Sequence, residues 1–308
     1  MKILLAGGAG FLGSHLTEAL VGRGDVVTVL DNLSSGRKKN LSAVMKKIRV
    51  INSDVSSFRT NEKFDVVMNF ASRASRREWE NFPVEVAKTN AFGTDNLINI
   101  ALRSEAKFLL ASTSEIYGNP DIIPTPVSYV GRVSSTGSRS SYDEGKRYAE
   151  ALVKAYDSQF SLNSIIIRFF NTYGPRMRGG DLYGRVIDRF LQQATNNVPL
   201  TVYGSGMQTR SFTYISDTLS AIIKILDNWR IGEIYNVGSD NEIRIIDLAN
   251  LIIKITGSSS RIIKQDMPPD DPLRRAADVS KLKQLGWKQE IDLKEGLEFM
   301  LSAEKKES

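Results

Sequence analysis

Three glycines at intervals of three residues follow the first apolar run of the chain. The run Ile3–Ala6 is aliphatic, and Gly7, Gly10 and Gly13 come directly after it, where we expect a helix to begin near Leu12. Because glycine has no Cβ, the backbone can turn tightly there and approach a bound anion, and the unpaired N–H groups of the first helical turn favour negative charge. The spacing therefore predicts a strand, a phosphate-binding turn and a helix.

The nucleotide is indicated by Asp31, which ends the second apolar run. An acid about 20 residues beyond such glycines can accept hydrogen bonds from the ribose hydroxyls and repels a 2′-phosphate. This favours NAD over NADP, although Arg37 and Lys38 stand nearby. Asp54 and Val55 follow the third run and are placed to meet the adenine, but Asp54 fits an ordinary strand-end aspartate equally well.

Short aliphatic runs recur at intervals long enough to hold helices. The expected strands are Ile3–Ala6, Val26–Leu30, Ile48–Ile51, Val66–Phe70, Phe108–Ala111 and Ile165–Phe169. Apolar strands that alternate with helices are typical of a parallel sheet covered on both faces. We expect an α/β fold: a Rossmann-type, doubly wound parallel sheet in residues 1–170, to which 212–238 returns. A smaller C-terminal α/β lobe is expected in 171–211 and 239–308.

Tyr142 and Lys146 stand four residues apart at the start of an expected helix from Asp143 to about Ser158. This spacing puts both side chains on one helix face. A nearby ammonium and the positive nicotinamide favour tyrosinate, so Tyr142 could accept a proton from an alcohol as hydride leaves. Such pairs are usually structural, but a preceding dinucleotide site makes a catalytic pair the better interpretation.

A polar segment, Ser112–Thr113–Ser114–Glu115, ends the strand that precedes this helix. Ligands in open α/β sheets bind at the carboxyl ends of the strands. Thr113 and Ser114 could therefore hydrogen-bond a sugar hydroxyl. Glu115 is either a second acid–base group or a solvated loop carboxylate.

Composition narrows the chemistry. The 308 residues include no cysteine and one histidine, His15, which excludes disulfides, thiol nucleophiles and histidine-rich metal sites, so we expect no metal. The net charge of +6 comes from scattered Lys and Arg, which suit an anionic small ligand, and we expect no nucleic-acid partner. Without a signal-peptide pattern or a run of about 18 apolar residues, we expect a cytoplasmic protein with no membrane partner.

With these motifs together, the sequence resembles the extended short-chain dehydrogenase/reductase superfamily. The resemblance lies in its nucleotide-sugar branch, in particular with the UDP-glucuronate decarboxylases, also called UDP-xylose synthases. It runs from Lys2 to about Met300. The motifs that carry it are Gly7–Gly13, Asp31–Asn32, Ala111–Gly118, Tyr142–Arg147, Arg168–Met177, Leu200–Arg210 and Asp270–Arg275.

The resemblance implies a carboxy-lyase reaction with NAD as cofactor: oxidation of UDP-glucuronate at C4, loss of CO2 from the β-keto acid, and re-reduction to UDP-xylose. Thr113–Ser114–Glu115 matches the decarboxylases, whereas 4,6-dehydratases resemble Thr-Asp-Glu there and 4-epimerases usually have small residues. The alternative is an NAD-dependent 4-epimerase of UDP-glucose, UDP-galactose or UDP-glucuronate, with a 4,6-dehydratase behind it. A catalytically silent NAD-sensing or RNA-binding relative is a further alternative.

The resemblance also implies which residues form the site. The catalytic set is Tyr142, Lys146, Thr113, Ser114 and Glu115. The cofactor set is Gly7, Gly10, Phe11, Leu12, Gly13, Asp31, Asn32, Ser35, Gly36, Asp54, Val55, Ala71, Ser72, Asn90, Ser112, Tyr142, Lys146 and Arg176. The substrate set is Arg73, Thr113, Glu115, Asn171, Arg185, Tyr203, Gln208, Arg210 and Arg275.

Within the substrate set, the resemblance places Asn171 and Arg210 at the diphosphate and Tyr203 and Gln208 at the uridine end. Arg185 and Arg275 complete an anion clamp. Residues 1–170 then form the NAD-binding domain, and the second lobe binds the nucleotide sugar. The resemblance further implies a homodimer that pairs helices near Asn96 and Tyr148, which would account for the apolar stripe Ala149, Leu152, Val153 and Tyr156.

The sequence departs from the decarboxylase pattern at one place. Where these enzymes typically have Leu-Ala-Ser-Pro-Ala-Ser-Pro, this chain has Phe70–Ala71–Ser72–Arg73–Ala74–Ser75–Arg76. Two prolines are thus replaced by arginines beside the expected sugar pocket. The arginines either bind the sugar carboxylate or are merely exposed.

Overall fold

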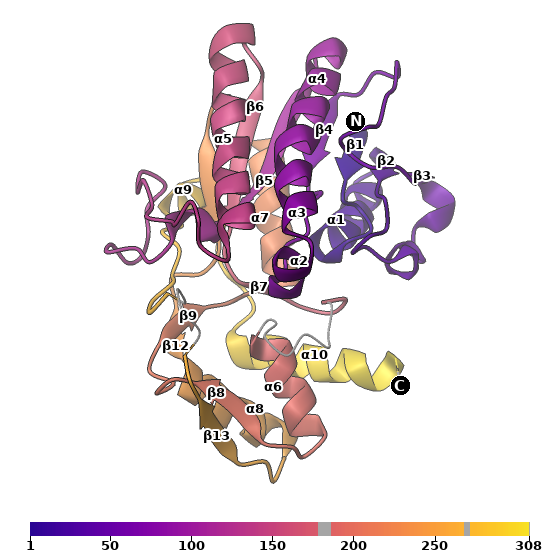
Figure 1. The fold of residues 1–308 in the computed structure, drawn as a ribbon. Coiled ribbons are helices and arrows are strands. Elements are labelled where there is room, and N and C mark those ends of the chain that lie inside the picture. The colour runs from indigo at the N-terminus through magenta and orange to yellow at the C-terminus, as the bar shows by residue number, and fades with distance from the viewer. Residues whose placement is uncertain (178–185, 268–271, 308) are drawn as a thin grey trace. The chain divides into compact units, whose positions relative to one another are not determined.

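The computed structural model describes residues 1–177, 186–267 and 272–307, and the chain forms two compact units (Figure 1). The first unit contains Met1–Ile116, Val133–Arg168 and Leu226–Tyr235. The second contains Tyr117–Arg132, Phe169–Ile225 and Asn236–Ser308. The stretch that rejoins the first unit is shorter than the expected 212–238, because helix α7 (Ile215–Asp227) belongs almost entirely to the second unit.

A seven-stranded sheet forms the centre of the first unit, in the order β11-β6-β5-β4-β1-β2-β3. Six of its strands lie where the sequence predicts them, while β11 was not among the expected strands. The strands are β1 (Lys2–Ala6), β2 (Val26–Leu30), β3 (Arg49–Ile51), β4 (Val66–Asn69), β5 (Lys107–Thr113), β6 (Ser164–Phe169) and β11 (Ile234–Val237). The pairs of β1 with β2 and with β4 are parallel, with Leu4 opposite Thr28 and Val67.

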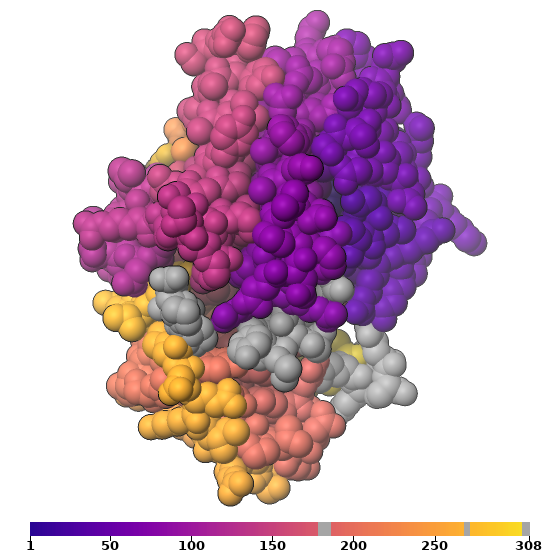
Figure 2. Space-filling model, in the orientation of Figure 1, coloured from indigo at the N-terminus to yellow at the C-terminus, as the bar shows by residue number. Residues whose placement is uncertain are grey.

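The strand order makes the sheet doubly wound. From β1 the chain moves outward to β2 and β3, and from β4 it moves the other way to β5 and β6. Because such crossovers are right-handed, α1 (Phe11–Gly22) lies on one face, and α4 (Thr94–Ser104) and α5 (Ser140–Phe160) lie on the other. Figures 1 and 2 show α4 and α5 side by side. The confirmed Rossmann arrangement creates a switch point between β1 and β4, where such sheets bind ligands.

Shorter elements complete the first unit. They are helices α2 (Arg76–Asn81) and α3 (Pro83–Lys88), a π-helical turn at Thr89–Gly93, and 3-10 turns at Lys38–Leu41, Met45–Lys47 and, at the junction with the second unit, Ser114–Tyr117.

The apolar stripe of α5 packs on the core of its own unit. Ala149 and Val153 are fully buried in one cluster with Leu97 of α4 and Phe108 of β5, and Leu152 and Tyr156 pack against that cluster. The expectation that this stripe serves a dimer contact is therefore wrong. The sheet supplies the partner surface, because β5 and its neighbours are apolar on the face that α5 covers.

The second unit is a smaller α/β lobe with three two-stranded sheets, β10-β7, β12-β9 and β13-β8. The strands are β7 (Thr172–Tyr173), β8 (Leu200–Tyr203), β9 (Thr209–Ser211), β10 (Thr213–Tyr214), β12 (Glu242–Arg244) and β13 (Ile262–Gln265). Besides α7, the helices are α6 (Val186–Thr195), α8 (Ile245–Thr256), α9 (Ser280–Gln284) and α10 (Leu293–Glu307). Over the described stretches, no helix is long and apolar enough to cross a membrane.

Candidate active site

The glycine turn after β1 has no room for a side chain at Gly7 or Gly13. Gly7 has φ +78°, and a Cβ on it would lie 2.5 Å from the Phe70 carbonyl carbon. A Cβ on Gly13 would overlap the carbonyl oxygen of Gly7. Gly10 caps α1 with extended backbone and no side-chain hydrogen bond, so the first turn of α1, with Phe11 and Leu12, presents its backbone N–H groups. This is the phosphate-binding geometry that the sequence predicts.

Asp31 joins the glycine turn to the end of β2. Its Oδ2 accepts a hydrogen bond from the backbone N–H of Ala9 at 2.9 Å, and its Oδ1 accepts one from Leu33 at 2.8 Å. Burial raises the pKa of Asp31, although these two backbone hydrogen bonds oppose the shift. Gly36 approaches so closely that a Cβ on it would lie 2.9 Å from Oδ2. The carboxylate is therefore fixed beside the turn.

A pocket opens in the first unit at the carboxyl ends of β1, β2 and β4. Eight members of the predicted cofactor set line it: Gly7, Gly10, Asp31, Asn32, Ser35, Val55, Ala71 and Ser72. Leu30, Ser34, Ser53, Phe70, Arg73 and Thr89 complete the lining. A glycine wall that side chains would fill, next to an acid at the end of β2, fits a dinucleotide.

Other members of the cofactor set do not line this pocket. Asp54 accepts hydrogen bonds from Asn32 Nδ2 and from the Ser56 backbone, each at 2.9 Å. Burial alone would raise the pKa of Asp54, but hydrogen bonds from Ser56 and Asn32 and the charge of Arg73 lower it. Asn90 Oδ1 accepts a hydrogen bond from Ser72 Oγ at 2.9 Å. Arg176 lies in the second unit with φ +66°.

Tyr142 and Lys146 lie one turn apart near the start of α5, and both are buried. Lys146 Nζ donates a hydrogen bond to the Ala111 carbonyl at 2.8 Å, which fixes the ammonium against the end of β5. Burial lowers the pKa of Lys146 to about 8, although the negative charge of Glu150 opposes the shift. The Tyr142 ring packs on Trp79 of α2, with ring centroids 5.0 Å apart.

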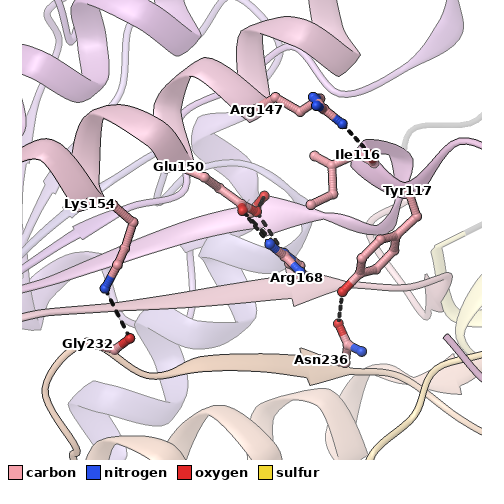
Figure 3. Close-up of polar contacts among 9 residues, drawn as sticks. Ile116, Tyr117, Arg147, Glu150, Lys154, Arg168, Gly232 and Asn236 are labelled. Atoms are coloured by element: carbon pink, nitrogen blue, oxygen red, sulfur yellow. Dashed lines mark hydrogen bonds and ion pairs between the residues drawn. The ribbon is translucent and has the colours of Figure 1, made fainter. Parts of the chain in front are cut away.

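A buried ion pair lies one helical turn beyond Lys146. Arg168 of β6 donates to both carboxylate oxygens of Glu150, with Nη2 to Oε2 at 2.7 Å (Figure 3). Ser112, at the end of β5, also donates to Glu150. The network ties α5 to β5 and β6 and so fixes the backbone that carries Lys146. Sequence analysis did not single out Glu150 or assign a role to Arg168.

Glu115 forms an ion pair with Arg139, the residue just before α5. The same guanidinium lies 3.5 Å from an Asp143 carboxylate oxygen and 5.5 Å from the centre of the Trp79 ring. The Glu115 N–H also donates to Thr113 Oγ1. Thus Thr113, Ser114, Glu115, Tyr142 and Lys146 all lie at the adjoining ends of β5 and α5. Arg139 was missed, and its position three residues before Tyr142 was the only available signal.

Arg73 and Arg76, which replace the two prolines of the decarboxylase pattern, have different surroundings. Arg73 lines the cofactor pocket and forms a 2.5 Å ion pair with the buried Glu78. Arg76, by contrast, pairs with Glu80 one turn along α2 at 2.6 Å. Arg73 is therefore not merely exposed, whereas the Arg76–Glu80 pair lies at the surface, with side chains 31% and 40% exposed.

In the second unit, several predicted substrate residues gather around Ser211 and Tyr203. Asn171 Nδ2 donates to the Ser211 carbonyl at 3.0 Å, and the Ser211 N–H donates to the Arg275 carbonyl at 3.0 Å. Arg210 precedes Ser211 on β9. Gln208 Nε2 donates to the Tyr203 carbonyl at 2.8 Å, so these two residues are adjacent. Arg185 lies outside the described residues.

Comparisons with known proteins agree with this geometry. The profile described as the NAD dependent epimerase/dehydratase family matches residues 3–238. UDP-glucuronic acid decarboxylase 1 of Arabidopsis thaliana is 42% identical over 98% of this chain and 69% of its own length. The Xenopus tropicalis protein of the same name is 42% identical over 96% of this chain and 70% of its own length.

Solved structures of nucleotide-sugar enzymes share the fold. UDP-glucose 4-epimerase of Thermotoga maritima has a TM-score of 0.91 at 26% identity, covering 100% of this chain and 99% of its own. UDP-glucuronic acid 4-epimerase of Bacillus cereus, in complex with UDP-glucuronic acid and NAD, has a TM-score of 0.88 at 28% identity over 100% of both chains. With its glycine turn, Asp31 and the Tyr142–Lys146 pair, this chain belongs to the NAD dependent epimerase/dehydratase family and uses NAD as its cofactor.

Proposed function

We propose that the chain converts UDP-glucuronate to UDP-xylose and CO2. The observation that carries the proposal is the similarity, about 40% over nearly the whole chain, to several UDP-glucuronic acid decarboxylases. The arrangement of Thr113, Glu115, Tyr142 and Lys146 at the ends of β5 and α5 supports it. The first unit then acts as the NAD-binding domain, and the second binds the nucleotide sugar.

NAD would bind in the pocket at the carboxyl ends of β1, β2 and β4, because the residues that line this pocket suit a dinucleotide. Gly7, Gly10 and the first turn of α1 would hold the pyrophosphate, and Asp31 would hold the adenosine ribose. When bound, NAD supplies reversible hydride transfer at C4 of the sugar. Tyr142 removes the proton of the C4 hydroxyl, and the neighbouring Lys146 ammonium stabilises the tyrosinate that this requires.

Loss of CO2 depends on the residues around the C4 oxygen. Once C4 is a ketone, the C6 carboxylate is that of a β-keto acid, so the C5–C6 electron pair moves into an enolate as CO2 leaves. Thr113 and Tyr142 hydrogen-bond the enolate oxygen. One proton from solvent then reaches C5. Because the Glu115 side chain is fixed by its ion pair with Arg139, we infer that it orients the water that delivers this proton.

The substrate's anionic end would be held in the second unit. Asn171, Arg210 and Arg275 are neighbours around Ser211, and guanidinium groups suit a diphosphate. Tyr203 and Gln208, which are also neighbours, would hold the uridine. Arg176 would belong to the cofactor contacts.

We further propose a cytoplasmic homodimer. The turn before α4 exposes 61% of Phe92, and α5 exposes 54% of Tyr148, although both are large apolar residues. The two elements pack against each other within the first unit. Asn96 is buried and donates to the Val55 and Phe58 carbonyls, so its side chain is not available to a second subunit. The dimer contact would therefore use Phe92, just before α4, instead of Asn96.

The test is incubation of the purified protein and NAD with UDP-glucuronate while CO2 and the UDP-sugar are followed. We expect stoichiometric CO2 and UDP-xylose. Tyr142→Phe should abolish the reaction, and Glu115→Gln should lower turnover while leaving NAD affinity unchanged. Formation of UDP-galacturonate alone would instead identify a 4-epimerase.

The 4-epimerase is the second candidate because the Bacillus cereus UDP-glucuronic acid 4-epimerase has the same fold at 28% identity. It needs the same Tyr142–Lys146 pair but has no evident use for the Glu115–Arg139 ion pair. The higher identity to the decarboxylases and the Thr113–Ser114–Glu115 segment therefore favour the lyase.

A further inference from the structure

Arg73 occupies an unexpected position for a sugar-binding residue. It follows Ala71 and Ser72 after β4, and all three line the pocket that contains the glycine turn. Among the residues that line this pocket, Arg73 is the only cation and Asp31 is the only anion. Of the described residues, Arg73 therefore supplies the sole positive side chain to the wall of the cofactor pocket.

The guanidinium is held in place by two side chains that do not line the pocket. Its Nη1 lies 2.5 Å from Oε2 of Glu78, a residue of α2, in an ion pair. The centre of the Phe82 ring lies 4.6 Å from the guanidinium carbon. The side chain is only 19% exposed. Guanidinium has five donors in a planar fork, so one carboxylate leaves capacity for another anion.

The charge of the ligand calls for such a cation. The pyrophosphate of a dinucleotide carries two negative charges, while the first turn of α1 and the glycine turn offer only backbone N–H groups. Asp31 adds a negative charge at the same pocket. The charge of Arg73 also helps lower the pKa of the Asp54 carboxyl, so Arg73 acts electrostatically on a carboxylate that borders the same pocket.

We propose that Arg73 is a cofactor-binding residue that pairs with the phosphates of NAD, with Glu78 and Phe82 as its support. On this proposal Arg73 binds the cofactor rather than the sugar carboxylate, which was one of the two roles that the sequence left open. Arg76, three residues on, pairs with Glu80 and does not line the pocket. This gives a matched control on the same segment.

The test measures ligand affinity by calorimetry on the full chain freed of bound nucleotide, with NAD, ADP and adenosine as probes. Arg73→Met should weaken the binding of NAD and of ADP about tenfold or more, the loss expected for one charge-assisted hydrogen bond. It should change the affinity for adenosine less than about twofold. Arg73→Lys should retain part of the ADP affinity. Arg76→Met should bind all three probes like the parent protein.

A second variant guards against a folding defect. Arg73→Met alone removes the ion-pair partner of the buried Glu78 carboxylate, so the double variant Arg73→Met, Glu78→Gln removes both charges of the ion pair. It should show the same loss of ADP affinity and the unfolding midpoint of the parent protein. The proposal would be overturned if both variants kept the ADP affinity of the parent protein. It would also be overturned if their affinity for adenosine fell as much as their affinity for ADP. None of these readouts requires turnover of UDP-glucuronate, so the proposed function is tested separately.

Discussion

Lys146 shows how burial sets the chemistry of one side chain. Desolvation lowers its pKa to about 8, against the opposing charge of Glu150. The ammonium form therefore dominates below pH 8 and is lost as the pH rises through that value. As Lys146 loses its proton, Tyr142 loses the neighbouring positive charge that favours its tyrosinate form.

We therefore expect kcat to fall as the pH rises through about 8. The measurement is the pH dependence of kcat between about pH 6 and 10, under saturating substrate and cofactor. Lys154→Ala removes an exposed lysine of the same helix, paired with Asp157, and should leave the alkaline limb in place. A rate that stays level to pH 9.5 would contradict the assignment.

Arg139 gives a second prediction at this scale. Its ion pair holds Glu115 beside Thr113, so Arg139→Met should lower turnover about tenfold or more by removing a charge-assisted contact. Arg139→Lys should restore part of the rate. NAD affinity, measured by fluorescence titration, should not change. A full rate in Arg139→Met would show that Glu115 needs no such support.

The residues of the site differ in how far the sequence alone could reveal them. Tyr142 and Lys146 were found because they are four residues apart on one helix, a spacing visible in the chain itself. Arg139, Trp79 and Glu150 act through partners from other segments, which only folding brings together. Asp31 was found because a strand end and a glycine turn fix its place in advance.

At the scale of elements, the predicted strands of the large sheet are confirmed because each is mainly apolar and, apart from the edge strand β3, mostly buried. The second unit was harder to predict. Its strands, such as Thr172–Tyr173 and Thr209–Ser211, span two to four residues and pair with distant segments. In such short strands tertiary contacts outweigh intrinsic preference, so no periodic pattern marks them.

Helix α1 offers a matched pair of glycine substitutions. Gly13→Ala should destabilise the fold by about 3 kcal/mol or more and abolish NAD binding, since the added Cβ would overlap the Gly7 carbonyl oxygen. Gly22, in the last turn of α1, has open space around its Cβ position, so Gly22→Ala should be neutral or stabilising by up to about 1 kcal/mol. Urea unfolding and NAD titration of both variants check this. Equal stability of the two would refute the close approach.

At the scale of the whole molecule, the chain was expected to divide into two parts, and it forms two compact units. The return of a segment near 212–238 to the first unit was expected, but a second crossing between β5 and α5 was not. Tyr117–Arg132 belongs to the second unit although it lies between β5 and α5 of the first. The Tyr117 hydroxyl donates to Asn236 at 2.8 Å within the second unit, a contact across more than a hundred residues of sequence (Figure 3).

The homodimer is the prediction that belongs to the assembled molecule. Burial of Phe92 and Tyr148 against a second copy would remove apolar surface that the single chain leaves in water. We expect the parent protein to sediment as a dimer, and Phe92→Asp with Tyr148→Asp to sediment as a monomer, because two charges would then lie in each half of the contact. Val130→Asp, at an apolar residue that is 82% exposed in the second unit, serves as the control and should remain dimeric. A parent protein that is monomeric at micromolar concentration, or a dimer that survives both aspartates, would place the contact elsewhere. Since Ala149 and Val153 are buried in the core of their own unit, the contact would use the exposed face of α5 that carries Tyr148.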